Sequence, residues 1–229
     1  MAKKNRIDFL QIIIEIGVIT IGILIAYQLN SWNENRKIKE AEQSILREIR
    51  SNLQLDLIDI SGNQSGHEKS LQLIDSINFY ASGGLYNPVI PAYLFSAFRD
   101  FIFVPQTSAF ETLKAKGVDL IKNDSLRIRI LRLYDFQYSA VIQLEAEYAP
   151  GQFYEDFRYI AENYFLSYDI NNLRSIRPKF KGANWLSNPD IQIRLDLVRK
   201  ERSFFNEAYK ETLDEVKSLM EAIDKELNQ

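Results

Sequence analysis

The feature that most constrains this chain is an apolar run near its N-terminus, from Phe9 to Leu29, which contains a single acidic residue, Glu15. About 20 helical residues, each rising about 1.5 Å, match the hydrocarbon core of a bilayer, which is about 30 Å thick. A run of this length and composition predicts a transmembrane helix over residues 9–29.

A cleaved signal peptide is the alternative interpretation of this run, because Lys3, Lys4 and Arg6 precede it. The run is longer than the apolar core of a signal peptide, however, and no small-residue cleavage site follows it. Tyr27 and Trp32 lie where the aromatic anchors of a membrane interface are expected. These features favour an uncleaved signal anchor.

The flanking charges do not decide the orientation of the span, since three Lys or Arg residues lie close to it on each side. The short segment before the span favours an N-terminus held in the cytoplasm, with about 200 residues translocated. We therefore expect a single-pass protein of the inner (cytoplasmic) membrane. Residues 1–8 would form a short cytoplasmic tail, and residues 30–229 an extracytoplasmic domain in the periplasm.

Apolar residues spaced three and four apart dominate the chain after the span, which is typical of helices with one buried face. They predict a long helix over residues 33–81, ended by Gly83 and Gly84. The polar segment 61–66 contains two glycines and predicts a kink, a break, or a helix that its neighbours hold together. An aromatic-rich middle region, residues 82–170, follows this helix.

Within the middle region, short helices are expected over residues 92–101 and 108–117, the second opened by a capping-box pattern. A longer helix should begin with Asp124 as its N-cap. Residues 126–130 also alternate like a strand, but the helical spacing that continues beyond them favours a helix. A further helix is expected over residues 153–168, and the aromatic residues of the region are expected to form core rather than a ligand platform.

Residues 171–188 lack periodicity, carry several basic residues and predict a loop. Asn188 and the proline after it have the pattern of an N-cap and a first helical position, and they open a C-terminal helix over residues 189–228. The apolar stripe of this helix is interrupted at Arg202 and Thr212. The predicted fold is all-α, with a single N-terminal transmembrane helix continuing into an extracytoplasmic antiparallel helical bundle.

Composition restricts the chemistry that the chain can perform. A net charge of −3 provides no basic field, so no nucleic-acid partner is expected. The absence of cysteine excludes thiolate metal sites, and a single histidine, His67, excludes multi-histidine sites. His67 is expected at the surface because its neighbours are polar or glycine. We also find no glycine-rich phosphate loop, and so expect no cofactor, no metal and no enzymatic activity.

The segment from Glu15 to Lys37 resembles the N-terminal signature of an uncharacterised family of N-terminally membrane-anchored, mainly helical proteins of Bacteroidota. The residues that match this signature are Glu15, Gly22, Ala26, Gln28, Trp32, Asn33 and Glu34. Tyr27 departs from the leucine expected at its position, and a fainter match extends from Phe110 to Ile121. The resemblance implies a membrane anchor and a helical extracytoplasmic region, and it implies no activity.

One face of the predicted transmembrane helix carries polar and small residues. The residues that share it at helical spacing are Gln11, Glu15, Val18, Gly22, Ala26 and Leu29. Gly22 and Ala26 form a small pair that permits close approach of a second helix. An ionised acid near the bilayer centre costs about 2.5–3.5 kcal/mol on insertion scales, so Glu15 is expected to be protonated, paired or in a wet interior.

Glu15 is open to three interpretations: a packing or partner contact, an acid that reaches toward the inner interface, and an ion-transfer site. Three function classes correspond to the sequence as a whole. The first is a non-enzymatic anchored bundle that contacts membrane lipid and assembles as a homo-oligomer or with another membrane protein. The second is a sensory or ligand-binding module that signals through a partner, and the third is an ion-coupled membrane subunit that uses Glu15.

Overall fold

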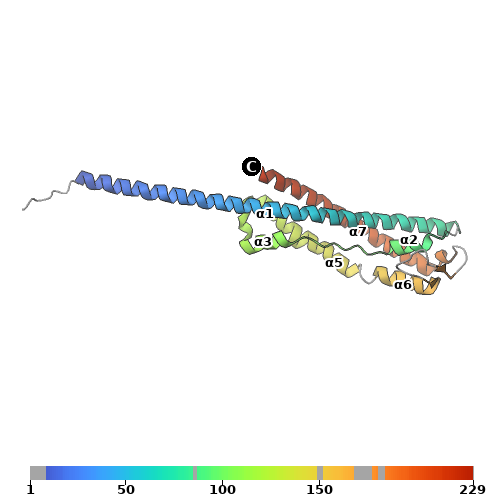
Figure 1. Ribbon diagram of the computed structural model, residues 1–229. Helices are drawn as coiled ribbons and strands as arrows, with labels where there is room; N and C mark the ends of the chain where they lie inside the picture. The colour runs from blue at the N-terminus through green and yellow to red at the C-terminus, as the bar shows by residue number, and fades with distance from the viewer. Residues whose placement is uncertain (1–8, 85–86, 149–151, 168–176, 180–183, 229) are drawn as a thin grey trace, which may run out of the picture.

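The computed structural model describes residues 9–84, 87–148, 152–167, 177–179 and 184–228, which are almost entirely helical (Figure 1). The all-α prediction is therefore confirmed. The elements in chain order are α1 (Phe9–Ser82), α2 (Ile90–Ala97), α3 (Ser108–Lys116), η1 (Val118–Leu120), α4 (Asp124–Arg132), η2 (Leu133–Tyr138), α5 (Ser139–Tyr148), α6 (Gln152–Tyr164), β1 (Phe165–Ser167), β2 (Arg177–Pro178), η4 (Asn184–Ser187) and α7 (Pro189–Leu227).

Helix α1 is uninterrupted over 74 residues, a length of about 110 Å at 1.5 Å per residue. It runs from the apolar segment to the far end of the body (Figure 1). The polar segment 61–66 does not break it, because its neighbours hold it in place. Asn63 is buried and its amide lies 3.5 Å from the Tyr209 hydroxyl of α7, while Gly66 lies against the ring of Phe101.

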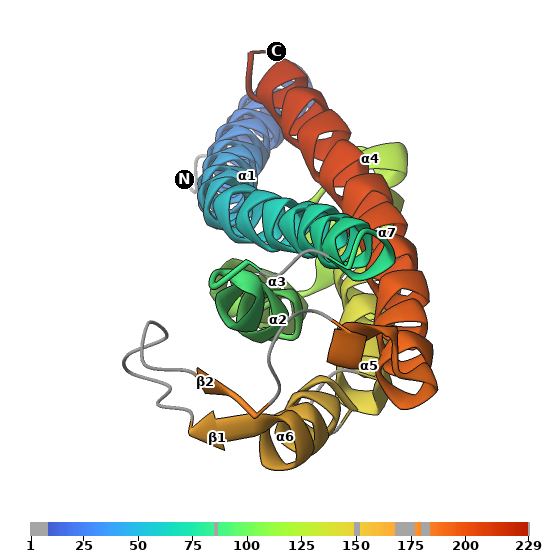
Figure 2. The same ribbon diagram turned by 90° about the vertical axis from the view of Figure 1, so that its right-hand side faces the viewer.

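Helix α7 packs antiparallel along α1, as expected for the bundle. At the end of the body nearer the apolar run, Arg50 donates to both carboxylate oxygens of Asp224, at 2.7 and 3.0 Å. Toward the opposite, far end of the body, Arg199 pairs with Asp75. Viewed from the far end, α2, α3 and α5 lie beneath this pair and the short β1–β2 hairpin lies at the edge (Figure 2). Helices α1 and α7, linked by an ion pair toward each end of the body, thus form its central helix pair.

The buried face of α7 contains every apolar residue of its predicted stripe. These residues are Ile191, Leu195, Val198, Phe205, Tyr209, Val216, Leu219 and Ile223. Arg202 and Thr212, which we expected to interrupt the stripe, are as buried as the apolar residues around them. Their burial is tolerated because Arg202 donates to the carbonyl oxygen of Ala97 and the Thr212 hydroxyl donates to that of Ala208, one turn earlier in α7. The predicted N-cap is confirmed, since the Asn188 side chain accepts from the backbone N–H of Asp190.

The boundaries in the middle region differ from the predictions by a few residues. Helix α2 ends at Ala97 rather than near residue 101, because an extended segment begins there. The predicted capping box of α3 is wrong: Thr107 is the N-cap and makes no side-chain hydrogen bond. The helix nevertheless ends before Gly117, whose φ of 100° is accessible to glycine at little cost.

Helices α4 and α5 are joined by the π-helix η2 into one helical run, so the helical interpretation of residues 126–130 is confirmed. The N-cap of α4 is Asn123 and not Asp124, since the Asn123 side chain accepts from the backbone N–H of Leu126. Helix α6 ends at Tyr164, where β1 begins.

The predicted loop 171–188 lies partly outside the described residues, including two of its four basic positions, Arg174 and Lys181. The described part contains β2, which pairs antiparallel with β1, and the 3-10 helix η4. Trp185 of η4 is buried, with its ring stacked on Tyr164 at 5.7 Å between ring centroids. Part of this segment therefore belongs to the packed body.

Candidate functional site

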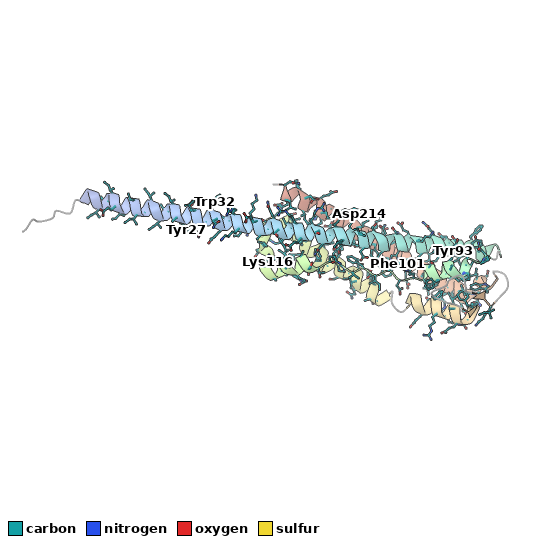
Figure 3. All side chains as sticks on the ribbon, viewed as in Figure 1. Tyr27, Trp32, Tyr93, Phe101, Lys116 and Asp214 are labelled. Atoms are coloured by element: carbon teal, nitrogen blue, oxygen red, sulfur yellow. The ribbon has the colours of Figure 1, made fainter. Side chains whose placement is uncertain are left out.

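The N-terminal part of α1 extends away from all the other helices (Figures 1 and 3). No side chain from Ile12 to Glu40 is buried, and the first buried position along α1 is Ile45. Among the described residues, α1 is the one helix that is long and apolar enough to cross a membrane. Its apolar side chains are covered by no other described part of the protein, and an exposed apolar surface of this extent marks a membrane or protein contact.

The predicted face of the span is open along its described length. Because α1 is continuous, its rotation of about 100° per residue places Glu15, Val18, Gly22 and Ala26 on one side. Nothing lies within 4 Å of a Cβ atom placed on Gly22, so a second helix could approach closely here. Gln11 belongs to the same helix, but its side chain lies outside the described residues.

The two aromatic residues proposed as interfacial anchors project from α1 into open surroundings (Figure 3). Tyr27 is 69% exposed and Trp32 is 64% exposed. The Arg36 guanidinium lies 5.7 Å from the Trp32 ring centroid, so an aromatic face and a cation meet just beyond the apolar run. This combination is typical of a helix end at a lipid–water interface.

A helical stalk separates the span from the body. Glu42 joins α1 to the body, since its carboxylate accepts from the backbone N–H of Lys122 at 2.7 Å. Residues 30–41 thus lie between the apolar run and the body and span about 18 Å at 1.5 Å per residue.

Inside the body, residues 99–106 belong to no helix or strand and run as an extended segment between α2 and α3, although a helix was predicted as far as residue 101 (Figure 1). Its backbone N–H groups cannot pair with a neighbouring strand, and carboxylates occupy that role instead. Glu145 accepts from Phe103 at 3.1 Å, Asp59 from Val104 at 3.0 Å and Asp56 from Gln106 at 2.7 Å. These acids satisfy backbone groups that would otherwise be costly to bury.

Two tyrosines complete the partners of the buried acids. Tyr138 donates to Asp56 at 2.9 Å, and Tyr209 donates to Glu145. Burial raises the pKa of Asp56 to about 6, although its hydrogen bonds act in the opposite direction. Burial also raises the pKa of Glu145. Both carboxylates are fully engaged in holding the extended segment.

Arg202 holds the start of the same segment from α7. Its Nη2 donates to the carbonyl oxygens of Ala97, at 3.2 Å, and Arg99, at 2.6 Å. Its Nη1 donates to Nδ1 of His67 at 3.2 Å. Burial lowers the pKa of Arg202 to about 10, so the guanidinium stays charged at neutral pH.

His67 is buried, with 2% of its surface exposed, so the prediction of a surface histidine was wrong. Its ring stacks on Phe205 at 5.3 Å and meets Phe101 edge-on at 5.1 Å between ring centroids. Because Nδ1 accepts from Arg202, the proton of the neutral ring is on Nε2. Burial, followed by the charge of Arg202, lowers the pKa of His67 to about 3.

Glycine at position 66 is what allows the aromatic side chain of Phe101 to reach this site. A Cβ atom at Gly66 would lie 2.2 Å from the Phe101 ring, whereas one at Gly62 would meet nothing within 4 Å. The glycine beside His67 therefore indicates a close contact between α1 and the ring of Phe101, and not a surface position.

The sequence did contain a signal for this buried polar network. On α1 the buried polar residues share one stripe with buried apolar residues. The positions of this stripe are spaced three and four apart: Leu53, Asp56, Ile60, Asn63, His67, Ser70, Ile74 and Ile77. Polar residues at the period of a buried face are buried partners or breaks in the stripe. The position of Arg202 within the stripe of α7 is the matching signal on the other helix.

The arrangement favours a structural role for this network. Among the described residues, no group of three or more His, Cys, Asp or Glu side chains could hold a metal ion. The buried acids and Arg202 bind backbone groups of the extended segment.

The profile of a family of unknown function (DUF6090) matches residues 15–155. The chain belongs to this family. The DUF6090 match begins at Glu15 and so includes the open face of the span from that residue onward, together with the stalk, the extended segment and η2. It ends within α6 and leaves out α7, which supplies Arg202 and Tyr209. No curated protein and no solved structure matches the chain.

Proposed function

We propose that this DUF6090 protein is a membrane-anchored, non-enzymatic helical protein that acts in assembly or partner recruitment through its span and its body. The observation that carries the proposal is the continuity of α1, in which an uncovered apolar segment and a core helix of the body are one element. Binding at the span is thereby coupled rigidly to the position of the body.

The open face of the span is the first contact surface in this proposal. Glu15, with Gly22 and Ala26 on the same face, is placed to meet a second copy, and protonated glutamates can hydrogen-bond across a symmetric helix pair. The anchor lies in the inner membrane with the N-terminus in the cytoplasm. The body then stands on its stalk about 18 Å beyond the apolar run on the periplasmic side.

A non-enzymatic role is supported by the use of the buried ionisable groups. Asp56, Glu145 and Arg202 bind backbone atoms, and His67 is held neutral by burial and by the charge of Arg202. A general acid or base needs access to a substrate and a pKa near the working pH. His67 has neither.

The test is the mass of the detergent-extracted full chain, measured by light scattering for wild type, Gly22→Leu and Gly17→Leu. Gly17 is the matched control, because it is also a span glycine with nothing within 4 Å but lies on a different face of α1. We expect a wild-type oligomer of the 26.7 kDa chain, a lower mass for Gly22→Leu and no change for Gly17→Leu.

Glu15→Gln sharpens this test, because glutamine keeps a hydrogen-bonding side chain but cannot ionise. An unchanged mass is expected if the span interface uses the protonated acid. Equal masses for wild type and Gly22→Leu would contradict a span interface through this face. A shift caused by both leucine variants would assign the effect to bulk rather than to the face.

A sensory role is the second candidate, and the same unbroken helix favours it. A ligand that bound the body and shifted α1 would move the span directly. The check is whether any small molecule that stabilises the body changes the distance between spin labels placed at the cytoplasmic ends of paired spans.

A further inference from the structure

A groove of about 1000 Å³ lies between the helical run α4–η2–α5 and helix α7. Its floor is apolar or small, with Leu133 and Val141 on one side and Ala208 on the other. Two aromatic side chains stand on its walls: Phe136 of η2 is 68% exposed and Phe204 of α7 is 55% exposed. Exposed phenylalanines beside an apolar groove mark a surface that another molecule covers.

The walls of the groove differ in charge. Arg129 and Arg132 lie on α4, whereas Glu207, Glu211 and Asp214 lie on α7. The groove thus has a basic wall and an acidic wall within one chain, together with an aromatic side chain on each. A surface that carries both a basic wall and an acidic wall can be complementary to a second copy of itself across a two-fold axis.

An ion pair between α4 and α7 shows which residues of the two walls lie at the same position, or height, along the helix axes. Arg129 donates to Glu215 at 3.0 Å, which fixes the antiparallel register of α4 and α7. One turn further along each helix, Arg132 lies level with Glu211, since three or four residues advance about 5 Å in either direction. By the same register, Phe136 lies near the level of Ala208.

We propose that a second copy of this chain docks on the groove, with a two-fold axis parallel to the membrane normal. The proposal rests on the membrane anchoring proposed above, because two copies anchored in one bilayer have the same orientation. An axis along the normal leaves heights unchanged. Arg132 of each copy therefore faces Glu211 of the other, and Phe136 of each enters the other's groove near Ala208.

The groove contact is separate from the span contact. No residue of α1 lines the groove, so both interfaces can be occupied at once. Two different two-fold contacts join copies into assemblies larger than a dimer. Disrupting either contact alone should leave dimers formed by the other, and disrupting both should give monomers.

The decisive experiment is a charge exchange in the full chain. Arg132→Glu alone places two pairs of acids across the interface, and Glu211→Arg alone places two pairs of cations there. Each should weaken the groove dimer about tenfold or more, because like charges at an interface are strongly unfavourable. The two variants are then co-expressed with different tags, and the mixed assembly is isolated through both tags.

In the mixed dimer both contacts are opposite in sign again. At one contact the two substituted side chains face each other as an acid and a cation, and at the other the native Arg132 faces the native Glu211. We expect mixed dimers to form in preference to either variant dimer when both chains also carry Gly22→Leu, which removes the span contact. An attraction between positions 132 and 211 of the same chain cannot produce this result, because within each variant chain these two positions carry charges of the same sign. Lys217→Glu is the control, an exposed cation of α7 outside the groove.

Three outcomes would overturn the proposal. Single variants that dimerise as wild type does would show that the groove carries no interface. Mixed dimers no more frequent than random pairing would show that Arg132 and Glu211 do not face each other. A lipid-like molecule retained on the monomer by native mass spectrometry, and lost on Phe136→Glu, would assign the groove to a small amphiphile. The span proposal is judged separately, by Gly22→Leu against Gly17→Leu.

Discussion

The two halves of helix α1 differ in which side chains they expose and which they bury. The projecting half, from Ile12 to Glu40, buries no side chain, although residues 12–29 of it are almost entirely apolar. The body half buries Asp56 and His67 at positions where apolar residues are the rule. One continuous helix thus shows that polarity does not decide burial by itself: the partners that other segments bring to each half decide it.

The comparison predicts that single substitutions in the body half and its partners will be costly, whereas those in the projecting half will leave the body's stability unchanged. The expected effects differ in size and, for two glycines, in sign. All of them are measured as changes in the free energy of unfolding of the detergent-solubilised full chain.

The largest effect is expected for Arg202→Met, which removes the buried donor of Ala97, Arg99 and His67. It should lower the free energy of unfolding by about 3–5 kcal/mol, because buried acceptors lose their charged partner. Arg199→Met is the matched control on the same helix. Its ion pair with Asp75 is solvent-exposed, so a loss of about 1 kcal/mol or less is expected in chemical denaturation.

The second prediction compares alanine substitutions at two glycines of α1 that lie one turn apart. Gly66→Ala should destabilise the body by about 1–3 kcal/mol, since its Cβ atom would displace the Phe101 ring. Gly62→Ala meets nothing and should stabilise the helix by about 0.5–1 kcal/mol. Thermal unfolding of the two variants beside wild type checks this. Equal shifts in one direction would show that Phe101 does not pack on Gly66.

The third prediction concerns pH and follows from His67, whose pKa falls from 6.5 to about 3 on folding. Below pH 6.5 the unfolded chain binds a proton that the folded chain does not. The free energy of unfolding therefore loses up to about 1.4 kcal/mol per pH unit as the pH falls toward 3. Asp56 acts oppositely, because its raised folded pKa of about 6 lets the folded state gain a proton first.

His67→Gln isolates the histidine contribution, since glutamine can accept from Arg202 but does not titrate. Relative to wild type, the variant should become steadily more stable as the pH is lowered from 6.5 to about 4.5, the range in which the unfolded histidine takes up its proton. Urea titrations at several pH values measure this difference. A constant difference across that range would mean that His67 is already accessible to protons in the folded state.

The smallest effects are expected in the projecting half. Gly22→Ala and Trp32→Ala should change the unfolding of the body by less than about 0.5 kcal/mol, because no described residue of the body contacts either position. A larger change would show that the span and the body form one cooperative unit through the stalk.

Much of the fold could be predicted from the sequence because it depends on local patterns. Apolar spacing predicted helices, Asn188 and its proline marked the start of α7, and paired glycines marked the end of α1. The small errors at Thr107 and Asn123 arose where several capping residues stand side by side. Which of several neighbouring residues becomes the N-cap depends on the tertiary surroundings of the helix end, which local sequence does not specify.

By itself the sequence determined the helical class, the apolar run of α1 and the face that carries Glu15, Gly22 and Ala26, since each follows from composition and helical period. Tertiary structure decided the extended segment 99–106, the burial of His67 and Arg202, and the groove beside η2. A buried polar side chain is stable only beside its partner, and here the partners lie many residues apart in the chain. Only folding brings them together.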